Sequence, residues 1–138
     1  MKINRSIPDS VVIPELPYTN VSEAAAWLGK ALGFTERLRI LNHRIQMNVG
    51  AGAIVLVERA SPALPRERCG HAILVRIEAL DEHFTRAQHH GATVLRPPAT
   101  HPYGERQYTV EDPGGHVWTF SETISDVHPQ EWGGELVS

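Results

Sequence analysis

The chain has 138 residues, the size of one domain that can bury its own core. Its 41% hydrophobic and 21% charged residues are typical of a globular protein, and a net charge of −3 argues against a nucleic-acid partner. One cysteine, Cys69, excludes an internal disulfide and a cysteine-based zinc site. The sequence has no signal-peptide pattern and no apolar run of membrane length, so we expect a cytoplasmic protein without a membrane partner.

The first half predicts one strand, one helix and three further strands. Residues 1–10 are polar and predict an arm. The β-branched run at 11–16 predicts an edge strand, because its prolines cannot donate to a ladder. Apolar residues at helical spacing over 20–34 predict a helix that is capped by Asn20 and ends at Gly33. Strands are then expected at 35–41, 43–50 and 53–58.

The same order returns after a linker at 59–70 that is rich in proline and arginine. The elements expected in this half are a strand at 71–77, a helix at 78–91 and strands at 92–98, 105–112 and 116–122. A polar tail at 123–138 follows. In this tail Trp132 is either a surface anchor or a lid or dimer contact.

Two pairs of glycines keep the halves in register, which indicates an internal repeat. Gly33 and Gly91 end the two helices, and Gly52 and Gly115 mark the turn before the last strand of each half. We therefore predict an α+β fold with one domain over 1–138. Two βαβββ repeats, at about 11–58 and 71–122, form a curved mixed sheet cup with the helices on its outer face. An unrelated α+β domain of similar content is the alternative.

Two segments carry a resemblance to a known family. YGERQYTVEDPGGHVWTF and the glycine-ended helix before it resemble the C-terminal half of vicinal oxygen chelate proteins, the glyoxalase, bleomycin-resistance and dioxygenase superfamily. VIPELPYTNVSEAAAWLGKALGF is similar to the opening strand and helix of that family, and the bleomycin-resistance-like or PhnB-like branch is the most similar. The resemblance implies the paired βαβββ fold and a homodimer whose cups lie between the two chains.

The resemblance also implies four metal ligands of the His, Glu or Gln type, one each from the first and fourth strands of each half. The matching positions are Ile13, Leu56, His71 and Thr119. Only His71 is a good metal ligand, so we expect no metal and no other cofactor. A displaced site of Glu15, Glu58 and His71 is the alternative. The two glutamates are otherwise expected to lie in water at the rim.

Alternation along the strands predicts which side chains face the helices and which face the cup. The helix side should hold Ile45, Met47, Tyr108, Val110, Trp118 and Phe120. The cup should be lined by Gln46, Asn48, Gln107, Thr109, Glu111, Val117, Thr119 and Ser121. Such a lining suits a polar organic ligand, although a polar sheet face also occurs without one. Tyr103 precedes a cup strand and either stacks on a flat ligand or packs at an edge.

Three functions are compatible with this pattern. The first is a metal-free small-molecule binder of the bleomycin-resistance type, which sequesters an aromatic or cationic compound. The second is a metal-dependent glyoxalase-like lyase, isomerase or epimerase with a displaced ligand set. The third is a metal-free enzyme in which His71, with Glu15 or Glu58, is the acid–base group. We favour the first. The candidate ligand-binding residues are Glu15, Gln46, Asn48, Glu58, His71, Tyr103, Gln107, Thr109, Glu111 and Thr119.

Overall fold

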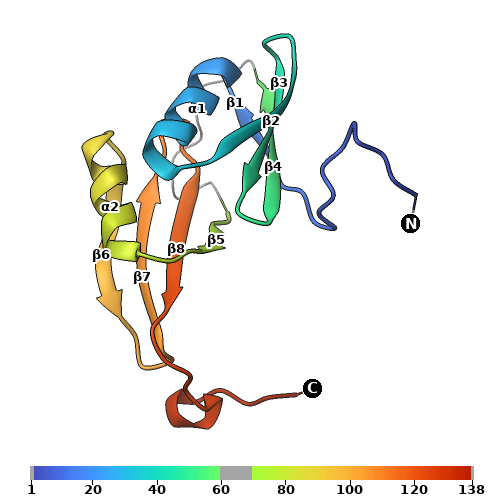
Figure 1. Cartoon of the computed structure of the whole chain (residues 1–138). Helices are drawn as coiled ribbons and strands as arrows, with labels where there is room; N and C mark the ends of the chain where they lie inside the picture. The colour runs from blue at the N-terminus through green and yellow to red at the C-terminus, as the bar shows by residue number, and fades with distance from the viewer. Residues whose placement is uncertain (1, 60–69, 138) are drawn as a thin grey trace.

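The computed structural model describes residues 2–59 and 70–137 and contains two four-stranded mixed sheets, one from each half (Figure 1). In the first half the elements are β1 (Glu15–Tyr18), α1 (Val21–Trp27), η1 (Leu28–Leu32), β2 (Thr35–Ile40), β3 (Arg44–Val49) and β4 (Gly52–Glu58). In the second half they are β5 (Ile73–Arg76), α2 (Leu80–His89), β6 (Thr93–Thr100), β7 (Glu105–Glu111), β8 (Val117–Thr123) and the short η3 (Pro129–Trp132).

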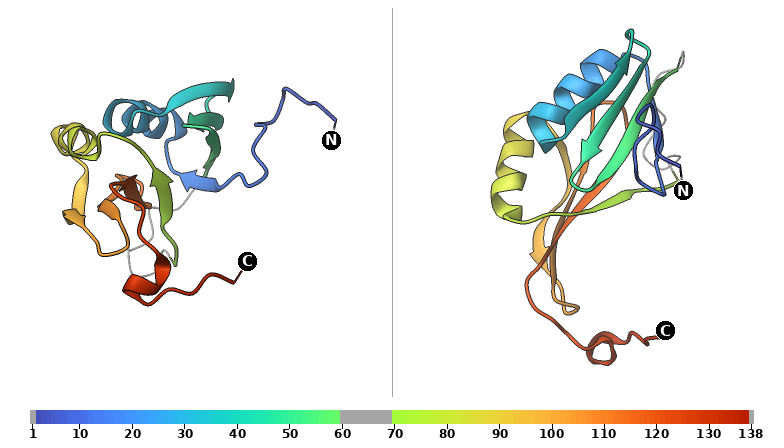
Figure 2. Two further views of the ribbon diagram at one scale, coloured as in Figure 1. Left: turned by 60° about the horizontal axis from the view of Figure 1, so that its bottom comes forward. Right: turned by 45° about the vertical axis from the view of Figure 1, so that its right-hand side comes forward.

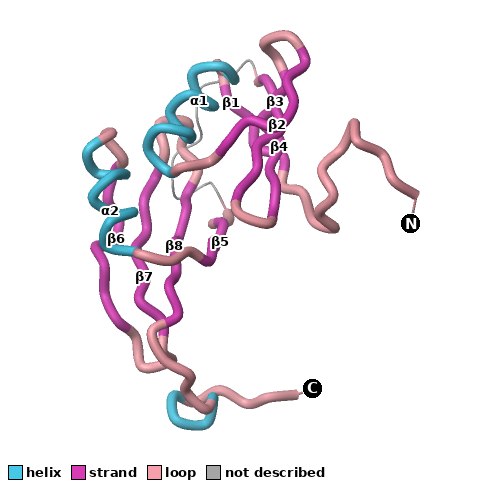
Figure 3. Tube along the Cα trace, in the orientation of Figure 1, coloured by secondary structure: helices cyan, strands magenta, loops and turns pink. Residues whose placement is uncertain are grey.

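The two sheets have the same topology. Their strand orders are β1-β4-β3-β2 and β5-β8-β7-β6, with the first strand parallel to the fourth and the other pairs antiparallel. This repeat confirms the predicted α+β fold of two βαβββ units. Figures 2 and 3 show both helices on one side of the sheets, which leaves the opposite faces of the two sheets, the hollow faces, without a helix.

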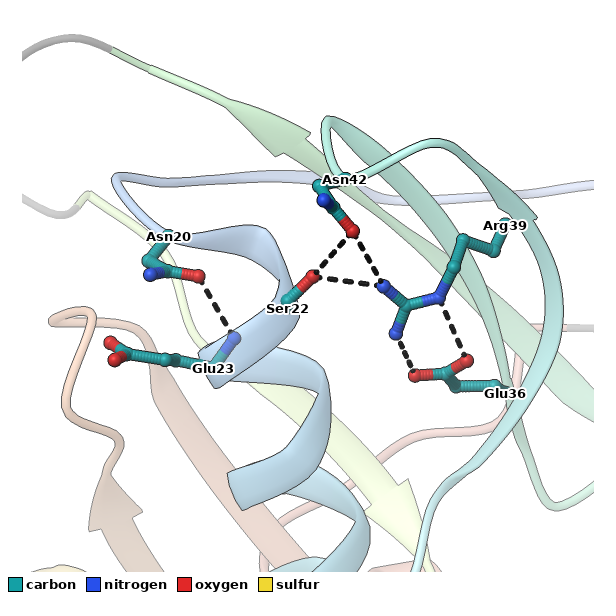
Figure 4. A network of polar contacts seen from close by, with 6 residues as sticks. All are labelled: Asn20, Ser22, Glu23, Glu36, Arg39 and Asn42. Atoms are coloured by element: carbon teal, nitrogen blue, oxygen red, sulfur yellow. Dashed lines mark hydrogen bonds and ion pairs between the residues drawn. The ribbon is translucent and has the colours of Figure 1, made fainter.

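The first helix begins and ends where the sequence predicts. The Asn20 side chain accepts a hydrogen bond from the Glu23 amide at 3.0 Å, which satisfies a free N–H of the first turn (Figure 4). The last turn, η1, is a π-helix, and the chain leaves it at Gly33 with a φ of 81°. A left-handed residue at this position favours glycine because a Cβ atom would be strained there.

A polar network ties the start of α1 to the β2–β3 hairpin (Figure 4). The Arg39 guanidinium donates to the Ser22 hydroxyl at 2.8 Å and to the Asn42 side chain at 3.3 Å, and it forms an ion pair with Glu36 at 2.6 Å. All of these groups are exposed, so the network orients the hairpin more than it stabilises the fold.

The first strand lies at the edge of its sheet, as predicted, but its predicted bounds were wrong. β1 covers Glu15–Tyr18, and the β-branched residues Val11 and Val12 before it are 93% and 78% exposed. The physical reason is burial: β1 is held in register with β4 by Leu16 and Tyr18, which are 2% and 3% exposed in the core.

The helix sides of both sheets share one hydrophobic core. The six residues predicted there, Ile45, Met47, Tyr108, Val110, Trp118 and Phe120, are all buried in it, which confirms the alternation. The rings of Phe34 and Trp118 lie 5.2 Å apart and join the halves across this core. The first half's η1 also packs against α2 of the second half, so this shared core joins the two repeats.

Two side chains of α2 reach across to η1 and connect the halves. The His83 imidazole makes one hydrogen bond to the Tyr108 hydroxyl and another to the Leu32 carbonyl at 3.0 Å. Arg86 donates to the carbonyls of Lys30 and Gly29 at 2.7 and 3.1 Å, so it ties α2 to the backbone of η1.

The predicted linker 59–70 and Cys69 lie almost wholly outside the described residues, of which only Arg59 and Gly70 belong to this segment. Among the residues that the structure describes, no helix has the length and apolarity needed to cross a bilayer.

Candidate functional site

The hollow face of the second sheet contains an open cavity of about 430 Å³. Thr109 of β7 and Thr119 of β8 lie opposite each other, and their hydroxyls are 2.9 Å apart. Leu74 of β5 is in register with Thr119 and is 64% exposed. The cavity is lined by Ala72, Leu95, Arg96, Thr109, Val117 and Thr119. A ligand here would meet hydroxyl groups and aliphatic surface together.

A row of hydrogen bonds extends this face toward the β6–β7 turn. The Tyr103 hydroxyl donates to the Gln107 side chain at 3.1 Å, and Gln107 donates to the Ser121 hydroxyl at 3.0 Å. Ser121 then donates to a Glu105 carboxylate oxygen at 2.6 Å. This hydrogen bond lowers the pKa of Glu105, so the row ends in an ionised carboxylate at neutral pH.

A group of aromatic side chains lies at the other end of this row, around Tyr103. The rings of His101 and Tyr103 are stacked with centroids 5.1 Å apart, and Trp132 of η3 lies 5.3 Å from Tyr103. Tyr103 is half-buried beside Trp132, which is itself 46% exposed. The C-terminal tail is held here because the Ile124 amide donates to the Gly104 carbonyl at 2.8 Å. Tyr103 therefore both packs at an edge and faces the polar row.

The middle of the hollow face of the first sheet is covered by the chain's own N-terminal arm. Gln46 is only 5% exposed, and its amide group donates to the Ser6 carbonyl at 2.9 Å. Asn48 lies on the same strand and is exposed, with its amide 3.4 Å from the Thr35 hydroxyl. Glu15 forms an ion pair with Arg44 at 2.9 Å. The predicted ligand residues of the two halves thus belong to two separate faces.

The positions that the resemblance matched to the family's metal ligands are not equivalent in the two halves. Leu56 is 0% exposed in the core and cannot face the cup. Ile45 pairs with Leu56 as Tyr108 pairs with Phe120, so the counterpart of Leu56 is Phe120 and not Thr119. The predicted alignment of the two repeats is therefore shifted by one residue in their last strands.

The displaced set of Glu15, Glu58 and His71 is wrong for a related reason. Glu15 is in register with Val55 and Glu58 with Tyr18, so the two glutamates point to opposite faces of the sheet. His71 precedes β5, with its ring centroid 6.4 Å from that of His116. In the described part of the chain, no three His, Cys, Asp or Glu side chains gather closely enough to hold a metal ion.

Sequence reasoning missed a buried carboxylate that joins the halves. Asp112 is 4% exposed and accepts hydrogen bonds from the Tyr18 hydroxyl at 2.5 Å and from the Trp118 indole at 3.0 Å. It also accepts from the amides of Gly114 and His116 at 3.0 and 2.9 Å. The DPGG run marked the turn, but nothing local shows that Tyr18, 94 residues away, is a partner. This node is structural, because four donors occupy its oxygens.

Residues 9–120 match the family described as the Glyoxalase/Bleomycin resistance protein/Dioxygenase superfamily. No curated protein gave a significant match. The chain is similar to TioX from Micromonospora sp. ML1, with 30% identity, 83% of this chain and 99% of that chain covered, and a TM-score of 0.70.

Two more distant structures share the fold. A glyoxalase-related enzyme from Fulvimarina pelagi is 18% identical, with 94% of this chain and 99% of that chain covered and a TM-score of 0.68. A bleomycin resistance determinant encoded on the transposon Tn5 is 17% identical, with 84% and 99% covered and a TM-score of 0.66. The repeated βαβββ topology and the matched residues agree: the chain belongs to the glyoxalase/bleomycin resistance protein/dioxygenase superfamily.

Proposed function

We propose that this protein is a small-molecule binding protein of the bleomycin-resistance type, which sequesters an aromatic, hydrogen-bonding compound without transforming it. The observation that carries this proposal is the open cavity of about 430 Å³ on the hollow face of the second sheet, where the paired Thr109 and Thr119 hydroxyls lie beside aliphatic side chains. Neutral hydroxyls bind and orient a ligand, but they are weak acids and bases without an activating partner.

The polar row that extends the same face supports this ligand class. Tyr103 offers an aromatic surface at one end of the polar row, and Gln107 offers an amide. The ionised Glu105 at the end of that row favours positive charge at that end of a ligand, whereas Arg96 lines the cavity itself and disfavours a cation there. We further propose that the protein acts in the cytoplasm as a homodimer. Binding of this kind removes a toxic compound stoichiometrically, which is how a drug-sequestering resistance protein works.

The test is a thermal-shift screen with aromatic compounds, including aromatic antibiotics, followed by recovery of each ligand. A true ligand should raise Tm as its concentration increases. At a ligand concentration of a hundred times Kd, the free energy of unfolding should increase by about 2.7 kcal/mol. In Thr119→Val this rise should shrink or disappear. The matched control is Thr93→Val, on the exposed part of β6 outside the cavity, which should keep the full rise.

Two results would contradict the proposal. Chemical conversion of the ligand during incubation would make the protein an enzyme. A stoichiometric transition metal in protein purified without chelator would support the metal-dependent alternative. A ligand that shifts Tm equally in wild type and in Thr119→Val binds elsewhere, which would disprove the site but not the binding activity.

A further inference from the structure

The N-terminal arm makes specific contacts with the hollow face of the first sheet. Three consecutive carbonyl groups of the arm accept hydrogen bonds from two side chains of that sheet. The Arg37 guanidinium donates to the Arg5 and Ile7 carbonyls at 3.0 and 3.2 Å, and the Gln46 amide donates to the Ser6 carbonyl at 2.9 Å. The arm is therefore bound through its backbone carbonyls and by the burial of Pro8.

The two donor side chains are also held in place by a hydrogen bond to each other. Arg37 also donates to the Gln46 side-chain oxygen at 2.5 Å, which fixes the amide with its NH₂ group toward Ser6. Gln46 is 5% exposed and uses both ends of its amide in these bonds. The buried Gln46 and the half-buried Arg37 donate to successive carbonyls and form a built recognition site, since each donor would lose a hydrogen bond if the arm left without a replacement.

The bound part of the arm is a compact turn. The Ile7 amide donates to the Asn4 carbonyl at 3.4 Å, and the Ser6 amide donates to the Asn4 side chain at 3.0 Å. The turn satisfies the amides of Ser6 and Ile7, and its outward carbonyls accept from the sheet. Pro8 follows the turn and is buried.

The turn occupies only the middle of the hollow face. A cavity of about 250 Å³ lies on one side of Pro8, lined among others by Ile13, Glu15 and Val55. Another of about 220 Å³ lies on the other side, lined among others by Arg37 and Asn48. Because Pro8 lines both cavities, removal of the arm would join them into one groove.

We propose that residues 4–8, the strap, are an intramolecular ligand of the hollow face of the first sheet. This face is a receptor for a peptide turn of another chain, and the incoming turn displaces the strap when it binds. The strap lies on the side of the sheet away from α1, and only the short segment 9–14 separates it from β1 (Figure 1). A tether of this length gives the strap a local concentration on the order of millimolar. A competing peptide must therefore bind the sheet more tightly than the strap does, or bind while the strap is released.

The probe for the test is a capped peptide of residues 4–10, acetyl-NRSIPDS-amide, which contains the strap and is titrated by NMR into the full-length chain. Pro8→Asp should release the strap, because it places a charge in the buried position. The released variant should bind the peptide about ten-fold or more tightly than wild type does, with amide shifts at Gln46 and Val55. Val11→Asp, which adds the same charge at a position 93% exposed, should behave like wild type.

A second substitution tests the receptor. Gln46→Leu in the released variant should weaken peptide binding by about ten-fold, since the Ser6 carbonyl would lose its donor. In wild type, the amides of Ser6 and Ile7 should be as rigid as those of β3 by heteronuclear NOE. Mobile amides there, equal peptide binding by wild type and Pro8→Asp, or no effect of Gln46→Leu would each overturn the proposal.

The oligomeric state distinguishes an intramolecular strap from an arm that is exchanged between two copies of the chain. If Pro8→Asp turns a dimer into a monomer, the arm is exchanged between two copies, and the strap is not intramolecular. The Tm shift caused by a ligand of the second sheet should be unchanged in Pro8→Asp. The strap and the second-sheet site can therefore fail independently.

Discussion

The two halves of this protein match on their helix sides and differ on their hollow sides. On the helix side, both sheets contribute large apolar residues to one core. On the hollow side, the first sheet holds the arm over a buried Gln46, whereas the second leaves Leu74 64% exposed beside a polar row. Packing preserves the residues that fill a core, while an open face is free to change. The comparison therefore predicts stability effects on the helix side and binding effects on the hollow side.

The largest effect should come from Asp112→Ala, which breaks the node between the halves. Tyr18 and Trp118 would lose their buried acceptor, and two amides of the turn would lose theirs. We expect a loss of about 3–5 kcal/mol in the free energy of unfolding, measured by urea titration. Asp126→Ala removes the same charge at an exposed position and should change the free energy of unfolding by less than about 0.5 kcal/mol. Equal losses in both variants would mean that the node does not hold the halves together.

The second effect concerns the turn that positions Tyr103. Gly104 has a φ of 85°, and a Cβ atom built there would lie 2.3 Å from the Ser125 carbonyl oxygen. Gly104→Ala should therefore cost about 1–3 kcal/mol and detach the C-terminal tail. Gly91→Ala is the matched control, with a φ of 84° and open space around it, so it reports the backbone strain alone. If the two variants unfold at the same urea concentration, the tail does not pack against the turn as described.

A smaller effect should appear in acid, because burial lowers the pKa of His83 in the folded state. The folded protein then binds fewer protons than the unfolded one, so its stability is complete above the ordinary histidine pKa of about 6.5 and falls as the pH drops below it. Protonation would also place a second cation near Arg86. Tm measured from pH 8 to pH 5 should fall less in His83→Gln, which cannot titrate. An equal fall in both would assign the acid sensitivity to other groups.

The smallest stability effect should come from Thr119→Val on the second hollow face. The substitution keeps the shape of the side chain and leaves the Thr109 hydroxyl near open space. We expect the free energy of unfolding to change by about 1 kcal/mol or less, even though ligand binding is lost. Thr93→Val, on the exposed part of β6, sets the baseline in the same urea titrations. A large loss of stability would show that Thr119 has a structural role and not mainly a binding role.

The sequence by itself determined the repeat and most of the faces. Glycines at the ends of the helices and an alternation of period two are local signals, so the capped helix at Asn20 and the inward Met47 and Trp118 followed from them. The same signals found the polar side chains of the second hollow face. They could not place β1, because the β-branched run at 11–13 resembles a strand as closely as the residues that form it.

Only the tertiary structure decided register and long-range contact. A one-residue difference in how the last hairpins pair moved Leu56 into the core and separated Glu15 from Glu58. The arm over Gln46 and the bond from Tyr18 to Asp112 likewise join distant parts of the chain. The physical reason is that local patterns fix the conformation of a segment, whereas its partner is chosen by the packing of the whole core.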